Sequence, residues 1–83
     1  MNWNYRIIKR VVEKEVFFQI HEVYYDESGM IEHWTANPIC PSGESLDELK
    51  NDCEHYLQAL TLPVLIEIMD TDGVNKLIEW RGK

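Results

Sequence analysis

Two stretches of alternating residues near the start of the chain constrain its fold most strongly. Residues 3–12 and 16–25 place β-branched and aromatic side chains at every second position. This period is typical of β-strands. Because only the polar segment 13–15 separates the two stretches, we expect them to pair as an antiparallel hairpin.

A third strand is expected over residues 30–36. It follows a turn in which Gly29 supplies a positive φ at little steric cost. Pro38 and Pro41 end the strand, because proline cannot donate to a sheet ladder.

One amphipathic helix is expected after these strands. Ser45 and Glu48 have the spacing of a capping box, in which the serine hydroxyl accepts from the Glu48 N–H and the Glu48 carboxylate reaches back to the Ser45 N–H. Apolar residues then recur at intervals of three and four, which predicts a single buried stripe. This stripe comprises Leu46, Leu49, Cys53, Tyr56, Leu57 and Leu60.

The last twenty residues fit two structures. Residues 64–69 and 74–80 could form a hairpin around the Asp72-Gly73 turn, and the spacing of Val64, Leu65 and Ile68 also fits a helix. We favour strand, turn, strand because of the turn chemistry. The expected fold is one α+β domain over residues 1–83, with two layers. It is an antiparallel β-meander of order β-β-β-α-β, with a possible further β, and the helix packs on one sheet face.

The expected sheet has two distinct faces. In a register without bulges, Phe18 faces Val11, and Glu22 pairs with His33 across strands. The face that the helix should cover carries Trp3, Tyr5, Ile7, Val11, Phe18, Ile20, Tyr24, Ile31 and Thr35. A bulge at Phe17-Phe18 would exchange the two faces.

The opposite face is predicted to be an interaction surface, because large apolar patches are uncommon on monomers and Arg, Tyr and Trp suit interface hot spots. The candidate interface residues on it are Arg6, Ile8, Arg10, His21, Val23, Tyr25 and Trp34. The alternative is that the final hairpin covers this face within one chain.

The charge distribution argues against several classes of partner. The chain carries 8 Lys and Arg against 15 Asp and Glu, a net charge of −7, and Lys50 is the only base in residues 15–72. Binding to nucleic acid or anionic lipid depends on basic residues and is therefore disfavoured. An apolar run of about 18 residues, long enough to span a membrane, is missing, so we expect a cytoplasmic protein.

Catalytic and metal-binding signals are weak. His21, His33, Cys40, Cys53 and His55 have no paired ligand spacing, and we expect two free thiols. The prediction is therefore no metal, no cofactor and no catalytic residue, and the sequence identifies no known small-molecule ligand. An enzyme using Cys40, His21 or His33 with nearby carboxylates remains an alternative.

Part of the chain, over about residues 5–65, resembles a group of small bacterial proteins of unknown function. The segments that carry this likeness are 20–26, 37–38 and 41–50. The β-β-β-α order, with Gly43, Ser45 and Glu48 opening the helix, also resembles the HicB-like antitoxin domain. That resemblance implies a partial ribonuclease H-like fold and inhibition of a small ribonuclease toxin. It carries over no catalytic residue, and no DNA-binding segment accompanies it.

Together these observations predict a small, non-enzymatic protein-interaction domain that binds a protein partner or forms a homodimer. The alternatives are an antitoxin-like inhibitor of a basic ribonuclease toxin and an RNA-binding module using Arg6 and Arg10 beside Tyr25 and Trp34.

Overall fold

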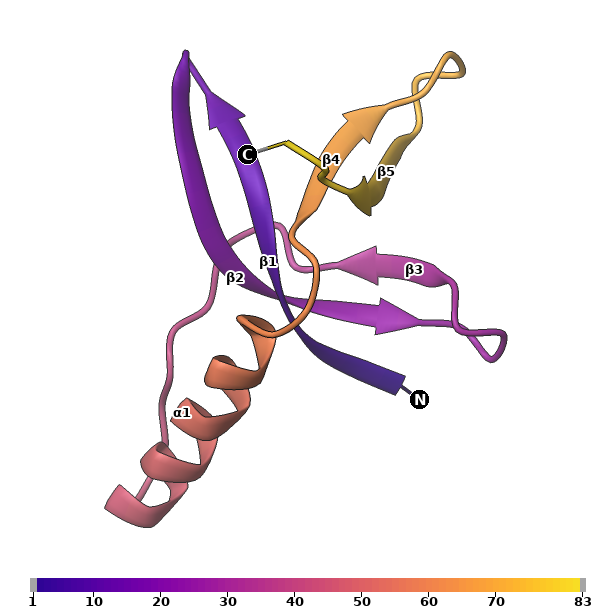
Figure 1. Cartoon of the computed structure of the whole chain (residues 1–83). Helices are drawn as coiled ribbons and strands as arrows, with labels where there is room; N and C mark the ends of the chain where they lie inside the picture. The colour runs from indigo at the N-terminus through magenta and orange to yellow at the C-terminus, as the bar shows by residue number, and fades with distance from the viewer. Residues whose placement is uncertain (1, 83) are drawn as a thin grey trace.

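The computed structural model describes residues 2–82 as one helix and five strands (Figure 1). In chain order the elements are β1 (Asn2–Val12), β2 (Glu15–Tyr25), β3 (Ile31–Trp34), α1 (Leu46–Ala59), β4 (Leu65–Met69) and β5 (Asn75–Glu79). The strands form one sheet in the order β3-β2-β1-β4-β5. The α+β class is confirmed, and so is the strand-turn-strand structure of the final segment.

The sheet is mixed, so the expected antiparallel meander is wrong beyond its first three strands. β4 lies beside β1 and runs parallel to it, with Ile8 opposite Leu65 and Lys9 opposite Ile66. Parallel neighbours need a long crossover connection. The segment between β3 and β4, which contains α1, gives the chain room to return beside β1.

The β1–β2 hairpin closes with a two-residue turn. Glu13 and Lys14 both have positive φ, 50° and 74°, and Glu15 pairs with Val12. Phe18 consequently lies opposite Lys9, not opposite Val11 as expected. A shift of two residues preserves the side on which each residue points, so the predicted division into two faces survives in this hairpin.

A bulge at the end of β2 changes the β3 register. Tyr24 lies opposite His33, but Tyr25 lies opposite Ile31. Ile31 therefore packs against the core on the face opposite to the predicted one. The expected Glu22–His33 pair is also wrong: His33 stacks on Tyr24 with ring centroids 4.7 Å apart, and Glu22 accepts a hydrogen bond from the Tyr24 hydroxyl.

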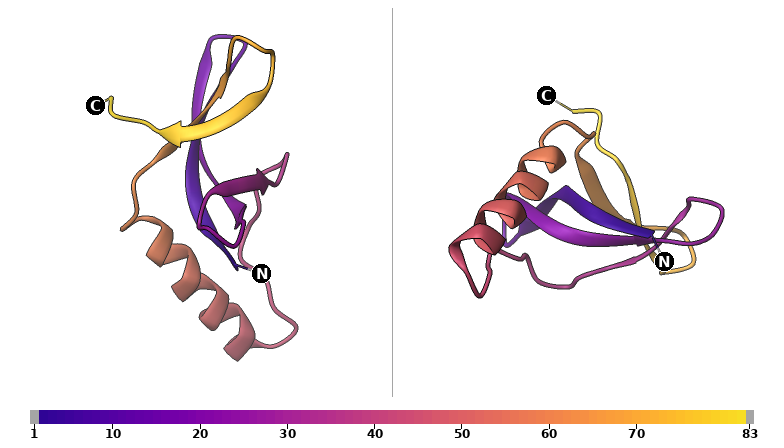
Figure 2. Two further views of the ribbon diagram at one scale, coloured as in Figure 1. Left: turned by 90° about the vertical axis from the view of Figure 1, so that its right-hand side faces the viewer. Right: turned by 90° about the horizontal axis from the view of Figure 1, so that it is seen from below.

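The helix begins where its sequence predicts. The Ser45 hydroxyl caps it by accepting from the Glu48 N–H at 3.1 Å, whereas the Glu48 carboxylate accepts from the Glu44 N–H, not from Ser45. α1 lies on the Tyr5 side of the β1–β2 ladder (Figure 2). The expected helix-covered face is therefore the correct one.

The β4–β5 hairpin curls over the central part of the opposite face of the β1–β2 ladder. Leu65 and Leu77 from this hairpin bury Ile8 of β1 and Val23 of β2. Tyr25, Ile31 and Trp34 are partly buried against the same cluster. The alternative that the final hairpin covers this face within one chain holds around Ile8 and Val23, whereas Val12 and Phe17 of the same face stay exposed.

Within residues 2–82, no helix is long and apolar enough to cross a membrane.

Candidate interaction surface

The predicted interface residues lie largely inside the chain. Ile8 and Val23 are 0% exposed and His21 is 1% exposed. The expectation that these three present an open face is therefore wrong, because the sequence does not reveal that β4 returns beside β1 and closes over them.

The other four predicted residues are half-buried, and their polar groups bond within the chain. Arg10 donates to the Ala36 carbonyl at 2.8 Å, and the Trp34 indole donates to the Glu67 carboxylate at 3.2 Å. Arg6 donates to the Tyr25 hydroxyl at 3.0 Å. Tyr25 and Trp34 also pack against the core, so these side chains make contacts within the chain.

His21 has a well-defined tautomer. Its Nδ1 lies 2.9 Å from the Thr35 carbonyl oxygen, which can only accept, so Nδ1 carries the proton. Nε2 is buried and has no partner within residues 2–82. Burial lowers the pKa of His21; nearby Arg10 lowers it further, whereas the Thr35 carbonyl and Glu67 raise it.

The open apolar surface lies elsewhere, first on the distal part of the β1–β2 hairpin. β1 pairs with β4 only through Ile8 and Lys9, so residues 10–18 project beyond the sheet (Figure 1); we call this segment the arm. Its exposed apolar side chains are Val11, Val12, Val16, Phe17 and Phe18. Trp80 covers the base of the arm, with its ring centroid 5.5 Å from that of Phe18. A two-stranded ribbon of this kind is marginally stable on its own.

A second apolar surface runs along α1. The sheet buries only the helix side that carries Tyr56 and Ala59. Leu46, Leu57 and Leu60 remain 66%, 62% and 64% exposed, and Cys53 is exposed as well. At 100° per residue these four side chains fall within about 60° of one another around the helix axis. We call them the helix stripe; the expectation that they are buried is wrong.

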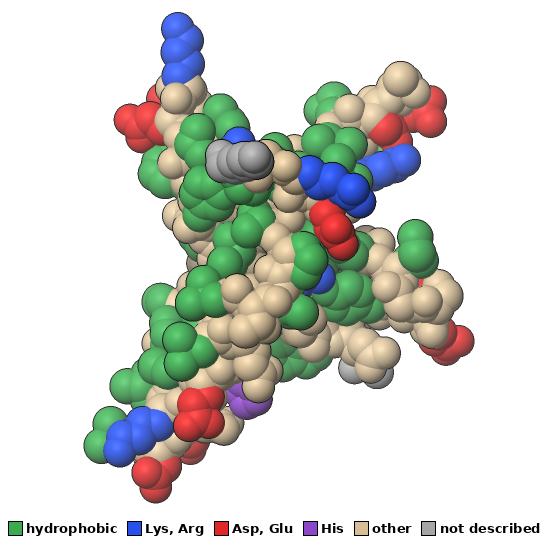
Figure 3. Space-filling view, in the orientation of Figure 1, with side chains coloured by type: hydrophobic (Ala, Val, Ile, Leu, Met, Phe, Trp, Pro, Cys, Tyr) green, Lys and Arg blue, Asp and Glu red, His purple; other side chains and the backbone are tan. Residues whose placement is uncertain are grey.

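The two apolar surfaces carry different charges. The helix contains four acids, Asp47, Glu48, Asp52 and Glu54, against Lys50. The arm and the adjoining Lys9 carry three bases and two acids. Figure 3 shows hydrophobic side chains exposed along α1, at the lower left, and on the arm, at the upper left.

The chain is extended for its size. Its accessible surface is 6367 Å², whereas a folded monomer of 9.9 kDa exposes about 5,200 Å². The radius of gyration is 13.8 Å, against about 12 Å for a compact domain of this length. The projecting arm and helix account for this extended shape. Both projections carry exposed apolar side chains.

A polar cluster anchors α1 to the sheet. Tyr5 donates to Asp52 at 2.7 Å, and Asp52 also accepts from the Ser42 N–H at 3.0 Å. These two hydrogen bonds hold the pKa of Asp52 below its usual range, and the bond from Ser42 has the larger effect. Burial, with Asp52 adding to it, raises the pKa of the neighbouring Tyr56 to about 12. The cluster holds its acid ionised and its phenols protonated, which suits an anchor and not a proton-transfer site.

The candidate nucleophile and metal ligands do not converge. Cys40 and Cys53 are both exposed, His33 is exposed on β3, and His21 is buried on the opposite side of the sheet. Residues 2–82 contain no group of three or more His, Cys, Asp and Glu side chains placed to hold a metal ion.

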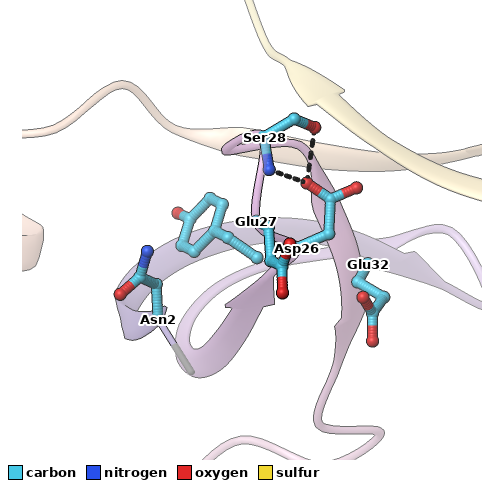
Figure 4. A pocket seen from close by; sticks show the side chains of 6 residues that line it. Asn2, Asp26, Glu27, Ser28 and Glu32 are labelled. Carbon is cyan, nitrogen blue, oxygen red and sulfur yellow. Dashed lines mark hydrogen bonds between the residues drawn. The ribbon is translucent and has the colours of Figure 1, made fainter.

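A hollow of about 650 Å³ lies beside the β2–β3 turn, between Asn2, Asp26 and Glu32 (Figure 4). The Asp26 carboxylate accepts hydrogen bonds from the Ser28 N–H, the Ser28 hydroxyl and the Met30 N–H. These bonds lower its pKa. The Asp26 hydrogen bonds stabilise the β2–β3 turn, and this turn shapes the hollow beside it.

Comparison with protein-family models, with curated proteins and with solved structures finds no match to this chain.

Proposed function

We propose that this chain is a non-enzymatic protein-interaction domain that works as a homodimer, in which the arm of each copy packs on the helix stripe of the other. The observation that carries the proposal is the simultaneous exposure of two apolar surfaces on a chain of this size. Five apolar side chains are open on the arm and three leucines on α1. By the β1–β2 register, Val11, Val16 and Phe18 share one face of the arm, and an exposed apolar cluster of this kind marks an interaction site.

The two surfaces suit a reciprocal contact. In a two-fold dimer, if the arm touches the partner's helix, the partner's arm touches this helix. The arm and α1 project in opposite directions from the sheet (Figure 1), so a two-fold rotation between them brings each arm toward the other copy's helix. α1 is acidic, and the arm with the adjoining Lys9 carries one net positive charge, so the two surfaces do not repel each other.

The surface area supports the same association. The chain exposes about 1,200 Å² more than a compact monomer of its mass, and a standard interface buries about 800 Å² on each partner. A small domain with six buried apolar side chains among residues 2–82 also gains from the added burial.

Sedimentation equilibrium tests the proposal. We expect a dimer for the unaltered chain, and we expect Val16→Glu in the arm and Leu57→Glu in the stripe each to weaken it at least about tenfold, because each buries an unpaired charge at the contact. Met30→Glu is the matched control: Met30 is 66% exposed and lies in neither surface. A chain that is monomeric at its highest soluble concentration would overturn the proposal, as would equal weakening by Met30→Glu.

An antitoxin-like inhibitor of a basic ribonuclease is the second candidate. The observation that favours it is the acidic character of α1, which carries four acids against Lys50. In this case the stripe would bind a basic partner in place of a second copy. A monomer that forms a complex with a co-expressed basic toxin would support this function and exclude the first.

A further inference from the structure

A groove of about 730 Å³ opens on the face of the sheet away from α1, between the edge strands β3 and β5. Its volume lies within the range of small-molecule sites, about 300–1,000 Å³. Apolar and aromatic side chains from four strands line it: Tyr25, Ile31, Trp34, Leu65 and Leu77. The groove is separate from the arm and from the helix stripe.

Arg6 lies in this groove without a counter-charge. Its Nη1 donates to the Tyr25 hydroxyl at 3.0 Å, and its Nη2 donates to the Pro63 carbonyl at 2.8 Å. Both acceptors are neutral. Within residues 2–82, no carboxylate forms an ion pair with Arg6, and its buried Nε has no acceptor. A guanidinium offers five N–H donors, so most of its capacity is unused.

A half-buried cation against apolar side chains is costly unless an anion accompanies it. The matching group is a carboxylate, which accepts charge-assisted hydrogen bonds from arginine. The rest of the groove matches a hydrocarbon or aromatic body. We propose that the groove binds a monocarboxylate with an apolar body, its carboxylate at Arg6 and its body along Ile31, Trp34 and Leu77.

The rim restricts the ligand to a single negative charge. Glu32 on β3 and Glu79 on β5 also line the groove, and both are exposed. Arg6 lies on the central strand β1 and therefore on the floor. Lys76, the other base in the lining, is paired with Asp70 at 3.1 Å. A second carboxylate at the outer end of the ligand would meet the two glutamates and be repelled.

The experiment compares octanoate with octanol, which share a chain and differ in charge. The readout is the NMR signal of the Trp34 indole N–H, assigned with Trp34→Phe and followed below the micelle concentration of octanoate. We expect octanoate to give a saturable shift and octanol to bind about tenfold or more weakly, because the charge-assisted bonds are absent. Equal binding of the two, or no saturable shift with octanoate, would overturn the proposal.

Variants locate the carboxylate. Arg6→Gln should weaken octanoate binding about tenfold and leave octanol unchanged, and Arg6→Lys should restore part of the affinity. Arg10→Gln is the matched control, since the Arg10 guanidinium donates to Ala36 and does not line the groove. Unchanged octanoate binding in a folded Arg6→Gln would overturn the assignment. If Arg6→Gln fails to fold, the comparison of octanoate with octanol in the unaltered chain decides.

Discussion

The Tyr5 hydroxyl donates a 2.7 Å hydrogen bond to the Asp52 carboxylate, and the bond ties the central strand β1 to the middle of α1. The two residues are 47 positions apart in the chain. The Tyr5 ring also packs on Tyr56 with centroids 4.4 Å apart. This anchor turns one side of the helix toward the sheet and leaves the adjacent stripe facing outward.

Removing this hydroxyl tests the anchor. Tyr5→Phe should lower the free energy of unfolding by about 1 kcal/mol, the usual net worth of one hydrogen bond, as measured by urea denaturation. The control is Tyr24→Phe, which removes a hydroxyl bonded to Glu22 only two residues away and so joins no separate elements. Equal losses in the two variants would show that the Tyr5 bond does not fix the helix.

Acid should destabilise the fold through His21. Burial lowers the pKa of His21 in the folded chain below the unfolded value of 6.5. The unfolded chain then binds the proton more readily, so stability is full above about pH 6.5 and falls as the pH drops below it. The Arg10 and Glu67 side chains act on His21 in opposite directions and leave this sign unchanged.

Melting temperature measured between pH 5 and 7.5, at one protein concentration, checks this prediction. His21→Gln should flatten the decline that the unaltered chain shows below about pH 6.5. His33→Gln removes a solvent-exposed histidine and should leave the decline in place. A slope carried by His33, or the same slope in all three proteins, would contradict the assignment.

Substitutions in the turn between β1 and β2 should increase the stability of the fold. Glu13 and Lys14 hold positive φ, which costs side-chain-bearing residues roughly 1 kcal/mol or more each, and Asn-Gly is the preferred pair in such a turn. Replacing Glu13-Lys14 by Asn-Gly should raise the free energy of unfolding by about 1 kcal/mol. Gly73, at φ 79°, gives the matched opposite case: Gly73→Ala should lower it by about 1 kcal/mol. Urea denaturation measures both, and a loss of stability in the Asn-Gly variant would refute the turn geometry.

Local patterns in the sequence determine much of this fold. The alternation over residues 3–25, the Ser45 cap and the Asp72-Gly73 turn each act within a few residues, and each predicted its element correctly. The parallel pairing of Ile8 with Leu65 depends on how the chain returns after α1, and no local pattern carries that information. The bulge between Tyr24 and Tyr25 is likewise a tertiary adjustment, and it moved Ile31 to the other face.

The burial of the predicted interface residues Ile8, His21 and Val23 escapes sequence patterns for a related reason. Amphipathic patterns show which residues avoid water, but they do not show which element of the fold will cover those residues. Val23 and Leu57 are equally apolar in sequence, yet β4–β5 buries Val23, while Leu57 remains open. The apolar side chains of α1 span a wider arc around the helix axis than the sheet covers. This wide arc is the sequence feature that indicates an exposed apolar surface on the helix.

Disulfide trapping between Val16→Cys in the arm and the native Cys53 of the helix stripe, in a Cys40→Ser background, tests the reciprocal dimer most directly. We predict that mild oxidation links two chains into one closed dimer, and that Cys53→Ser abolishes the link. An internal link with monomer mass, a ladder of higher multimers, or a dimer that persists without Cys53 would contradict the packing of each arm on the partner's helix.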